Sequence, residues 1–257
     1  MLKYLGEKFL SLTGYLGSIG ILFIQTLFLS FVPPFRRKSI FEQMAKIGVD
    51  SLSLVFLTSL FTGIVLALQS AYQMQKLGAE VYISSLVALS ITRELGPVLT
   101  ALVVAGRMGA AITAELGTMK VTEQIDALET LATNPIKYLV VPRFIALITM
   151  LPILTIYADF IGILGGFMVG VGKLGIGQSL YIRMTFNALN YKDVFTGLIK
   201  AFFFAIIIAI ISCREGIDTE GGAEGVGRAT TRAVVFSFIL IIAADCLFTA
   251  LFYFMFR

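Results

Sequence analysis

Five charged residues stand inside stretches of the chain that are otherwise apolar enough to cross a lipid bilayer. A charge facing lipid at the bilayer centre costs roughly 2.5 to 3.5 kcal/mol, so we expect these side chains to face a bundle interior or an aqueous cavity, in pairs. Two interpretations stay open, polar clamps between helices or polar elements of a substrate pathway. The five residues are Arg93, Glu94, Asp159, Lys200 and Asp245.

The spacing of these charges limits which of them can pair. Arg93 and Glu94 are adjacent, so on a helix they point about 100° apart and each needs a partner of its own. Lys200 and Asp245 lie on consecutive apolar stretches that must run antiparallel, at depths that differ by about two turns. They can form a direct ion pair only if Lys200 reaches inward. Pro97 removes a backbone hydrogen bond close to Glu94, and the resulting kink predicts a cavity wall there.

The residues needed for common enzyme chemistry are missing from the sequence. The chain has no histidine and no zinc-type cysteine cluster, which argues against metal-hydrolytic and nucleophilic sites. It also lacks the P-loop pattern, since its one Gly-Lys pair, Gly172-Lys173, is followed by Leu174. We therefore expect no catalytic residue, no metal and no directly bound cofactor.

The elements that must position the charges are membrane-spanning helices. The chain is 58% hydrophobic and 14% charged, with a mean hydropathy of +0.92, which is typical of a membrane protein. Its net charge of +4 does not indicate nucleic-acid binding, because the basic residues lie between the apolar runs. Five stretches are long enough to span, at 51–75, 81–111, 144–171, 194–213 and 233–256.

An apolar run at 16–32 precedes these spans and sits at the lower limit for crossing a bilayer. Because Lys3, Glu7 and Lys8 stud the residues before it, we expect residues 1–32 to form a helix in the membrane interface. A cleaved signal peptide is the rival, but no small-residue cleavage site follows the run. Lys and Arg are concentrated on the N-terminal side of the membrane, so the N-terminus is expected in the cytoplasm and the C-terminus outside.

Two connections on the expected cytoplasmic side are informative. Residues 113–134 carry apolar side chains at helical spacing and three acidic residues on another face, which predicts one amphipathic helix ending at Asn134-Pro135. This helix either rests at the interface or transmits force from a cytoplasmic partner. The Gly-rich segment 214–232 fits no phosphate-binding pattern and is expected to form a tight turn.

Small residues recur every four positions on two spans, a pattern typical of close helix packing. The ladders serve either packing within one chain or an interface between subunits. They comprise Ala101, Ala105 and Gly109, and Gly162, Gly166 and Gly170.

Several long motifs, in order, resemble the MlaE family of ABC transporter permeases. They are VALSITRELGPVLTALVVAGRMGAA at 87–111, AELGTMKVTEQIDALETLATNPIKYLVVPRF at 114–144, GGFMVG at 165–170 and GVGRATTRAVV at 225–235. The resemblance covers most of residues 49–256. It implies an all-α integral membrane protein with an N-terminal interfacial helix and basic cytoplasmic linker (1–48), followed by a five-span permease domain (49–257).

The resemblance also implies function. Such permeases move phospholipids between the bacterial inner membrane and the periplasmic or outer-membrane side, which maintains outer-membrane lipid asymmetry. They act as homodimers with two cytoplasmic P-loop ATPase subunits, which use the ATP, and with a periplasmic ring of MCE-domain proteins. The alternatives are an MCE-linked importer of sterols or other hydrophobic molecules and a membrane scaffold that transports nothing.

Site residues follow from the resemblance in the same way. A lipid cavity between two copies, formed by the first, second and fifth spans, would be lined by Arg93, Glu94, Lys200, Asp245, Leu66, Met74, Leu77 and Leu95. A coupling helix between the second and third spans, around 118–131, would contact the ATPase. Its residues would be Glu115, Met119, Lys120, Glu123, Gln124 and Asp126.

Overall fold

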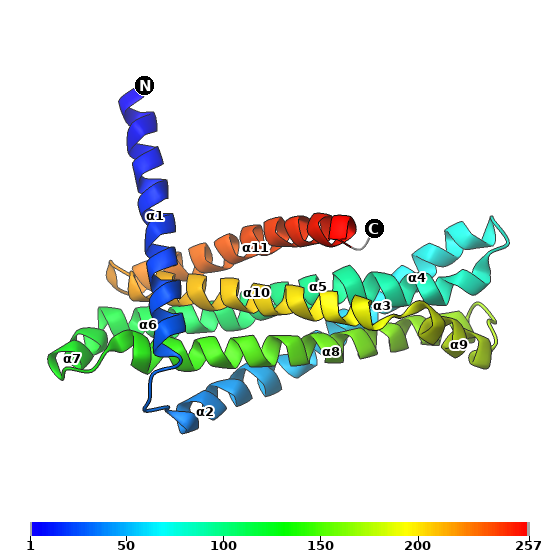
Figure 1. Ribbon diagram of the computed structural model, residues 1–257, viewed down its shortest axis with the longest axis horizontal. Coiled ribbons are helices and arrows are strands. Elements are labelled where there is room, and N and C mark those ends of the chain that lie inside the picture. Colours follow the sequence, from blue (N-terminus) through cyan, green and yellow to red (C-terminus); the bar gives the residue numbers. More distant parts are fainter. Residues whose placement is uncertain (1, 256–257) are drawn as a thin grey trace.

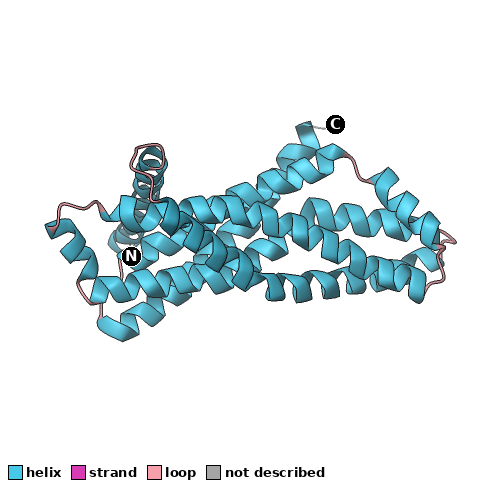
Figure 2. Cartoon of the chain, turned by 90° about the horizontal axis from the view of Figure 1, so that it is seen from below, coloured by secondary structure: helices cyan, strands magenta, loops and turns pink. Residues whose placement is uncertain are grey.

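Long helices that run side by side along a common direction form the body of the protein (Figure 1). The computed structural model describes the backbone of residues 2–255, and side chains from Thr13 onward except that of Leu16. Within this part the elements are helices joined by short loops (Figure 2), and five helices are long and apolar enough to span. The predicted number of spans is therefore confirmed. The spans are Arg37–Gln75, Glu80–Val121, Ile136–Gly172, Tyr191–Ile217 and Gly222–Met255.

The first span begins earlier than the sequence predicts. It comprises α2 (Arg37–Gly48), the 3₁₀ turn η1 (Val49–Ser51) and α3 (Leu52–Gln75). The boundary expected after residue 48 thus falls inside a continuous helix, because Ile47 is fully buried and Gly48 packs directly on Met150 of the third span. With 39 residues, or about 58 Å at 1.5 Å per residue, this helix is longer than the hydrocarbon core of about 30 Å requires.

The second span is one continuous helix with two widened turns. Close to Pro97, where the sequence predicts a kink, the helix has a π segment, and the Gly96 N–H donates to the Ile91 carbonyl five residues back. Proline has no N–H, so it cannot continue that pattern. The parts are η2 (Glu80–Tyr82), α4 (Ile83–Ser90), the π segment η3 (Ile91–Leu95), α5 (Gly96–Val104), the π segment η4 (Ala105–Gly109) and α6 (Ala110–Val121).

The remaining spans are joined by short connections. The Gly-rich segment 214–232 is mostly helical, and only residues 218–221 form the predicted tight turn, with Gly221 at φ +89°. A left-handed φ of this kind suits glycine, which has no Cβ to clash. In order, the elements are α7 (Gln124–Thr130), the π segment η5 (Ile136–Val140), α8 (Val141–Gly172), α9 (Gln178–Ala188), α10 (Tyr191–Ile217) and α11 (Gly222–Met255).

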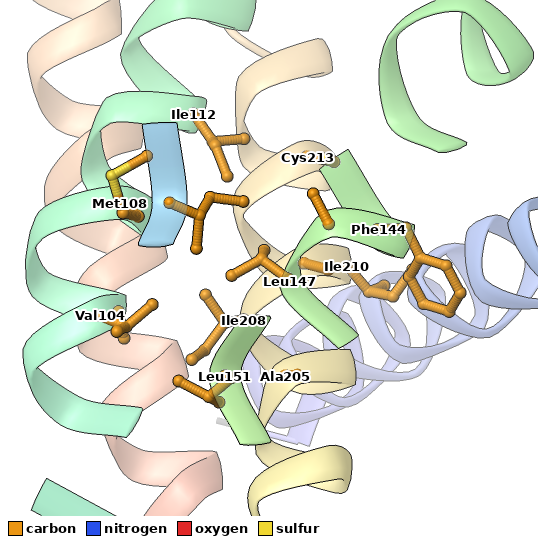
Figure 3. Packing of buried hydrophobic residues seen from close by; sticks show 14 of the residues in the cluster. Val104, Met108, Ile112, Phe144, Leu147, Leu151, Ala205, Ile208, Ile210 and Cys213 are labelled. Atoms are coloured by element: carbon orange, nitrogen blue, oxygen red, sulfur yellow. The ribbon is translucent and has the colours of Figure 1, made fainter. Parts of the chain in front are cut away.

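The apolar core lies where the second, third and fourth spans meet. Side chains such as Met108, Leu147 and Ile208 interdigitate there (Figure 3). In contrast, only 22% of the most apolar stretch of the first span and 11% of that of the fifth are buried, against 61% for the third. The first and fifth spans are therefore peripheral, and their apolar faces are left for lipid or another chain.

Both small-residue ladders pack within this one chain. A Cβ added at Gly63 of α3 would overlap the Gly162 carbonyl of α8, and Gly170 lies against the Tyr181 ring. On the second span, Gly109 faces Ser212 of α10. Of the two interpretations, intramolecular packing is confirmed for these positions.

The N-terminal helix α1 (Leu2–Leu29) runs across the long axis of the bundle (Figure 1). Two hydrogen bonds fasten it to the fourth span: Tyr15 Oη donates to Glu215 Oε1 at 2.7 Å, and Arg214 Nε donates to Ser18 Oγ at 3.0 Å. Burial and the carboxylate of Glu215 raise the pKa of Tyr15 far above its ordinary value, so its hydroxyl remains a donor. The exposed side chains of Ile24 and Phe28 suit the predicted interfacial position.

Substitution of Gly63 by Ala is expected to destabilise the protein by about 1 to 3 kcal/mol, because the new methyl group forces α3 away from α8. Thermal unfolding of the detergent-purified chain should show a lower Tm. Gly172→Ala is the matched control, since a Cβ at Gly172 of α8 meets open space and the Tm should be unchanged or slightly higher. Equal Tm values for the two variants would contradict the tight α3–α8 contact.

Candidate functional site: a polar cleft inside the helix bundle

A cleft of about 540 Å³ opens between the second, fourth and fifth spans. It combines charged side chains with aromatic rings, a mixture that suits a ligand with both polar and apolar parts. The lining residues are Arg93, Glu94, Asn190, Tyr191, Lys192, Asp193, Thr196, Lys200, Thr249, Phe252 and Tyr253.

Lys200 of α10 is the centre of the polar cluster, and its side chain is only 1% exposed. Its Nζ donates to Glu94 Oε2 at 2.5 Å and to Thr249 Oγ1 at 2.8 Å. Asp245 Oδ1 also lies 2.8 Å from Nζ, as an ion pair that is not aligned as a hydrogen bond. The three carboxylate and hydroxyl partners come from the second and fifth spans, so one ammonium group links three helices.

Arg93 has a different environment although it is adjacent to Glu94. Its Nε and Nη2 both lie 2.6 Å from Asp193 Oδ1 of α10. Asp193 is 2% exposed, whereas 57% of the Arg93 side chain remains exposed. The guanidinium is thus held on one edge and available on the others, as an anion-binding group requires.

Asp193 is a site residue that the sequence reasoning missed. Its Oδ2 accepts a hydrogen bond from the Asn190 backbone N–H at 2.9 Å, and the Asn190 side chain caps the first turn in return. The signal was available as the N-x-x-D pattern at 190–193, which is a capping box at the start of a helix. The box fixes the carboxylate so that Oδ1 faces Arg93.

A close approach of two backbones brings the partners together. Pro97 lacks the N–H that would bond to the Thr92 carbonyl in the π pattern of η3, and this carbonyl lies against Gly197 of α10. A side chain at position 197 would push the two spans apart. Since Lys200 is one turn beyond Gly197, the contact also sets the distance between Lys200 and Glu94.

The structure brings the four predicted charges together but not the four predicted apolar residues. Arg93, Glu94 and Lys200 line the cleft, and Asp245 joins them through its ion pair. Elsewhere, Leu66 and Met74 are half-buried against an apolar cluster around Val87 and Tyr181, Leu77 is 74% exposed, and Leu95 lines a separate small cavity. The apolar side of the cleft in this chain is formed instead by Phe252 and Tyr253.

Asp159 departs from the expectation that the intramembrane charges pair. Its Oδ1 is buried against Gly96, and no hydrogen bond or ion pair with another described residue involves it. The expectation is therefore confirmed for Arg93, Glu94, Lys200 and Asp245 and wrong for Asp159. Helix α8 of the third span packs against α5 of the second span here, so Asp159 faces the backbone of the second span at Gly96 rather than the cleft.

The segment predicted as one amphipathic helix is divided into two. Glu115, Met119 and Lys120 belong to α6, the end of the second span, and the helix breaks at Glu123, which has a left-handed φ of 59°. Gln124 and Asp126 follow on α7, which ends at Thr130, before the predicted stop at Asn134-Pro135. The prediction of a single helix is wrong because its apolar spacing joined two elements that meet at a sharp turn.

These six residues also differ in accessibility. Glu115 is ion-paired with Arg143 of the third span at 3.0 Å and Met119 packs against the core. Lys120 pairs with Asp126 across the turn at 2.7 Å. Glu123 and Gln124 are exposed at the tip of the bundle. Only the part around the turn therefore offers an open surface.

Five apolar helices with a charged cleft among them define a multi-pass membrane protein. The family model described as Permease MlaE matches residues 40–251, which is most of the chain. The chain belongs to the MlaE permease family.

Similar proteins carry related names. A probable ABC transporter permease protein of Rickettsia prowazekii is 52% identical over 221 residues, covering 86% of this chain and 85% of that protein. The intermembrane phospholipid transport system permease protein MlaE of Haemophilus influenzae is 41% identical over 211 residues, covering 82% and 81%. The chain is thus a permease subunit of the ABC transporter class and is not itself the ATPase.

Replacement of Lys200 by Met is expected to destabilise the protein by about 3 to 5 kcal/mol, since two carboxylates would face each other without their cation. Adding Glu94→Gln and Asp245→Asn to this variant should restore most of the loss. Denaturant or thermal unfolding measures both effects, with Lys173→Met at an exposed position as the control. A single variant as stable as the control would contradict the central role of Lys200.

Proposed function

We propose that this chain is the membrane subunit of an ABC transporter that moves phospholipids between the inner membrane and the periplasmic or outer-membrane side, and so maintains outer-membrane lipid asymmetry. The observation that carries the proposal is Arg93, which is held by buried Asp193 yet open toward a cleft that also contains aromatic rings. A guanidinium is suited to a phosphate, and apolar walls are suited to acyl chains.

The volume of the cleft bears on how a lipid would sit. About 540 Å³ falls in the range of pockets for small ligands, so the cleft would take the headgroup while the chains extend beyond it. Leu247, Leu251 and Phe254 of α11 are exposed on the side of this helix opposite the cleft-lining Thr249 and Phe252. A second copy of the chain would cover this apolar face, and we propose a homodimer with the acyl chains between the two copies.

Energy for transport would come from partners. No P-loop occurs in the sequence, so two cytoplasmic ATPase subunits would hydrolyse the ATP, and the permease itself would need no cofactor. We propose that the turn between α6 and α7, with Glu123 and Asp126 exposed, is the coupling contact. The proposed topology has the N-terminus in the cytoplasm and the C-terminus in the periplasm. An MCE-domain ring would contact exposed apolar residues on the periplasmic side, at the end of the bundle opposite the turn between α6 and α7.

Two alternatives make different demands on the cleft. A sterol or another neutral hydrophobic molecule has no use for an exposed guanidinium, which favours a phosphate-containing substrate. A scaffold that transports nothing would not need an open charged cleft within the membrane, because an exposed charge there is costly.

Arg93→Gln should lower the amount of phospholipid that co-purifies with the complex by about tenfold or more, because a charge-assisted hydrogen bond to phosphate is lost. Mass spectrometry of lipids extracted per permease measures this, and Lys173→Gln serves as the exposed control. Unchanged phospholipid in the Arg93 variant would argue against the cleft as headgroup site. Sterols or no stoichiometric lipid in the unsubstituted complex would favour one of the alternatives.

Glu123→Lys combined with Asp126→Lys should weaken co-purification of the ATPase subunit and lower ATPase activity by about tenfold, because two negative charges on the coupling surface become positive. Glu80→Lys at the opposite end of the bundle is the control. Normal assembly and normal ATPase activity of the double variant would rule out this surface as the contact.

A further inference from the structure

Four cationic side chains from two distant parts of the chain gather beside the turn between α1 and α2. Arg36, Arg37 and Lys38 lie at the start of α2, and Lys137 comes from η5, about a hundred residues later. Lys137 Nζ donates to the Pro33 carbonyl at 2.9 Å. The Arg36 guanidinium stacks on the Tyr138 ring, 3.5 Å from its centroid. These contacts hold Lys137 and Arg36 beside Arg37 and Lys38, which follow Arg36 in α2, and we call the four residues the basic patch.

The charge of the basic patch is not balanced within the described part of the chain. None of the ion pairs between described residues involves Arg36, Arg37, Lys38 or Lys137. The first turn of α2 contains no acidic residue and lacks a side-chain cap. Cations at this end oppose the helix dipole, so the arrangement is unfavourable unless an external anion compensates it.

Exposed aromatic side chains surround the basic patch. Phe31, Phe35 and Phe41 all have large exposed fractions, although they flank a highly charged segment. Alternation of exposed aromatic and basic residues is typical of segments that sit at the boundary between acyl chains and headgroups.

The position of the basic patch along the bundle agrees with this boundary. Helix α1 runs across the long axis, and the start of α2 lies at the same level of that axis as α1 (Figure 1). The exposed apolar side chains of α1, such as Ile21, Ile24 and Phe28, require lipid around them. An interfacial α1 therefore puts the four cations at the depth of the headgroups.

We propose that the basic patch is a binding site for anionic phospholipid headgroups of the cytoplasmic leaflet, separate from the transport cleft. Basic residues that only set membrane orientation need to be in excess on one side and need no particular arrangement. Here, in contrast, specific contacts join the α1–α2 turn to Lys137 and Tyr138. Clusters of basic residues beside a span attract acidic lipids in proportion to their charge. The proposal rests on the proposed membrane orientation but not on the identity of the transported lipid.

The test is lipid binding to the full-length purified chain, titrated in detergent with phosphatidylglycerol or phosphatidylcholine and followed by native mass spectrometry. The unsubstituted chain should bind phosphatidylglycerol more tightly than phosphatidylcholine. The variant Arg36→Gln, Arg37→Gln, Lys38→Gln should lose this preference, with an affinity for phosphatidylglycerol weaker by about ten- to a hundredfold. The effect should shrink at high salt.

A control variant distinguishes the basic patch from a general loss of positive charge. Lys76→Gln, Lys173→Gln, Arg183→Gln removes equal charge at the opposite end and should keep the preference. Arg36→Lys with Arg37→Lys retains charge and should bind as the unsubstituted chain does. A triple Gln variant that keeps its preference overturns the proposal. If that variant also fails to retain the ATPase subunit when the complex is purified, the basic patch is a protein contact instead.

Discussion

A lysine ammonium buried in a membrane protein needs negative partners, and this requirement organises the part of the bundle around the cleft. Lys200 is surrounded by Glu94, Asp245 and Thr249, which come from the second and fifth spans. The fifth span buries little of its apolar surface against the rest of the chain, so packing alone holds it weakly. The polar cluster supplies a directional contact that apolar side chains in lipid cannot provide.

The helices are deformed where this cluster forms. The π segment η3 carries both Arg93 and Glu94, and Pro97 follows it after a single residue, Gly96. An extra residue in the turn changes the direction of the two side chains relative to a regular helix, so that one meets Asp193 and the other Lys200. Gly197 allows the fourth span to approach this irregular turn closely. The site therefore depends on backbone geometry as much as on charge.

The number of spans and the inward direction of four charges could be predicted from the sequence, because hydropathy and the cost of buried charge act through local composition. The role of Asp193 could not be predicted in this way, since it lies just outside the expected span and acts through a helix cap. The prediction that Asp159 has a charged partner was wrong, because its surroundings depend on which helix packs against the third span at that depth. The division at Glu123 was hidden because apolar spacing continued through a turn of only a few residues.

The second span joins the exposed turn at Glu123 to the charges at Arg93 through uninterrupted helical backbone of about 45 Å, at 1.5 Å per residue. The two ends of this rod are chemically distinct and belong to one covalent element. If docking at the turn changes the affinity of the cleft for its ligand, that ligand must change docking at the turn by the same factor. Under the proposed function, a ligand in the cleft would then be a thermodynamic effector of the partner at the turn.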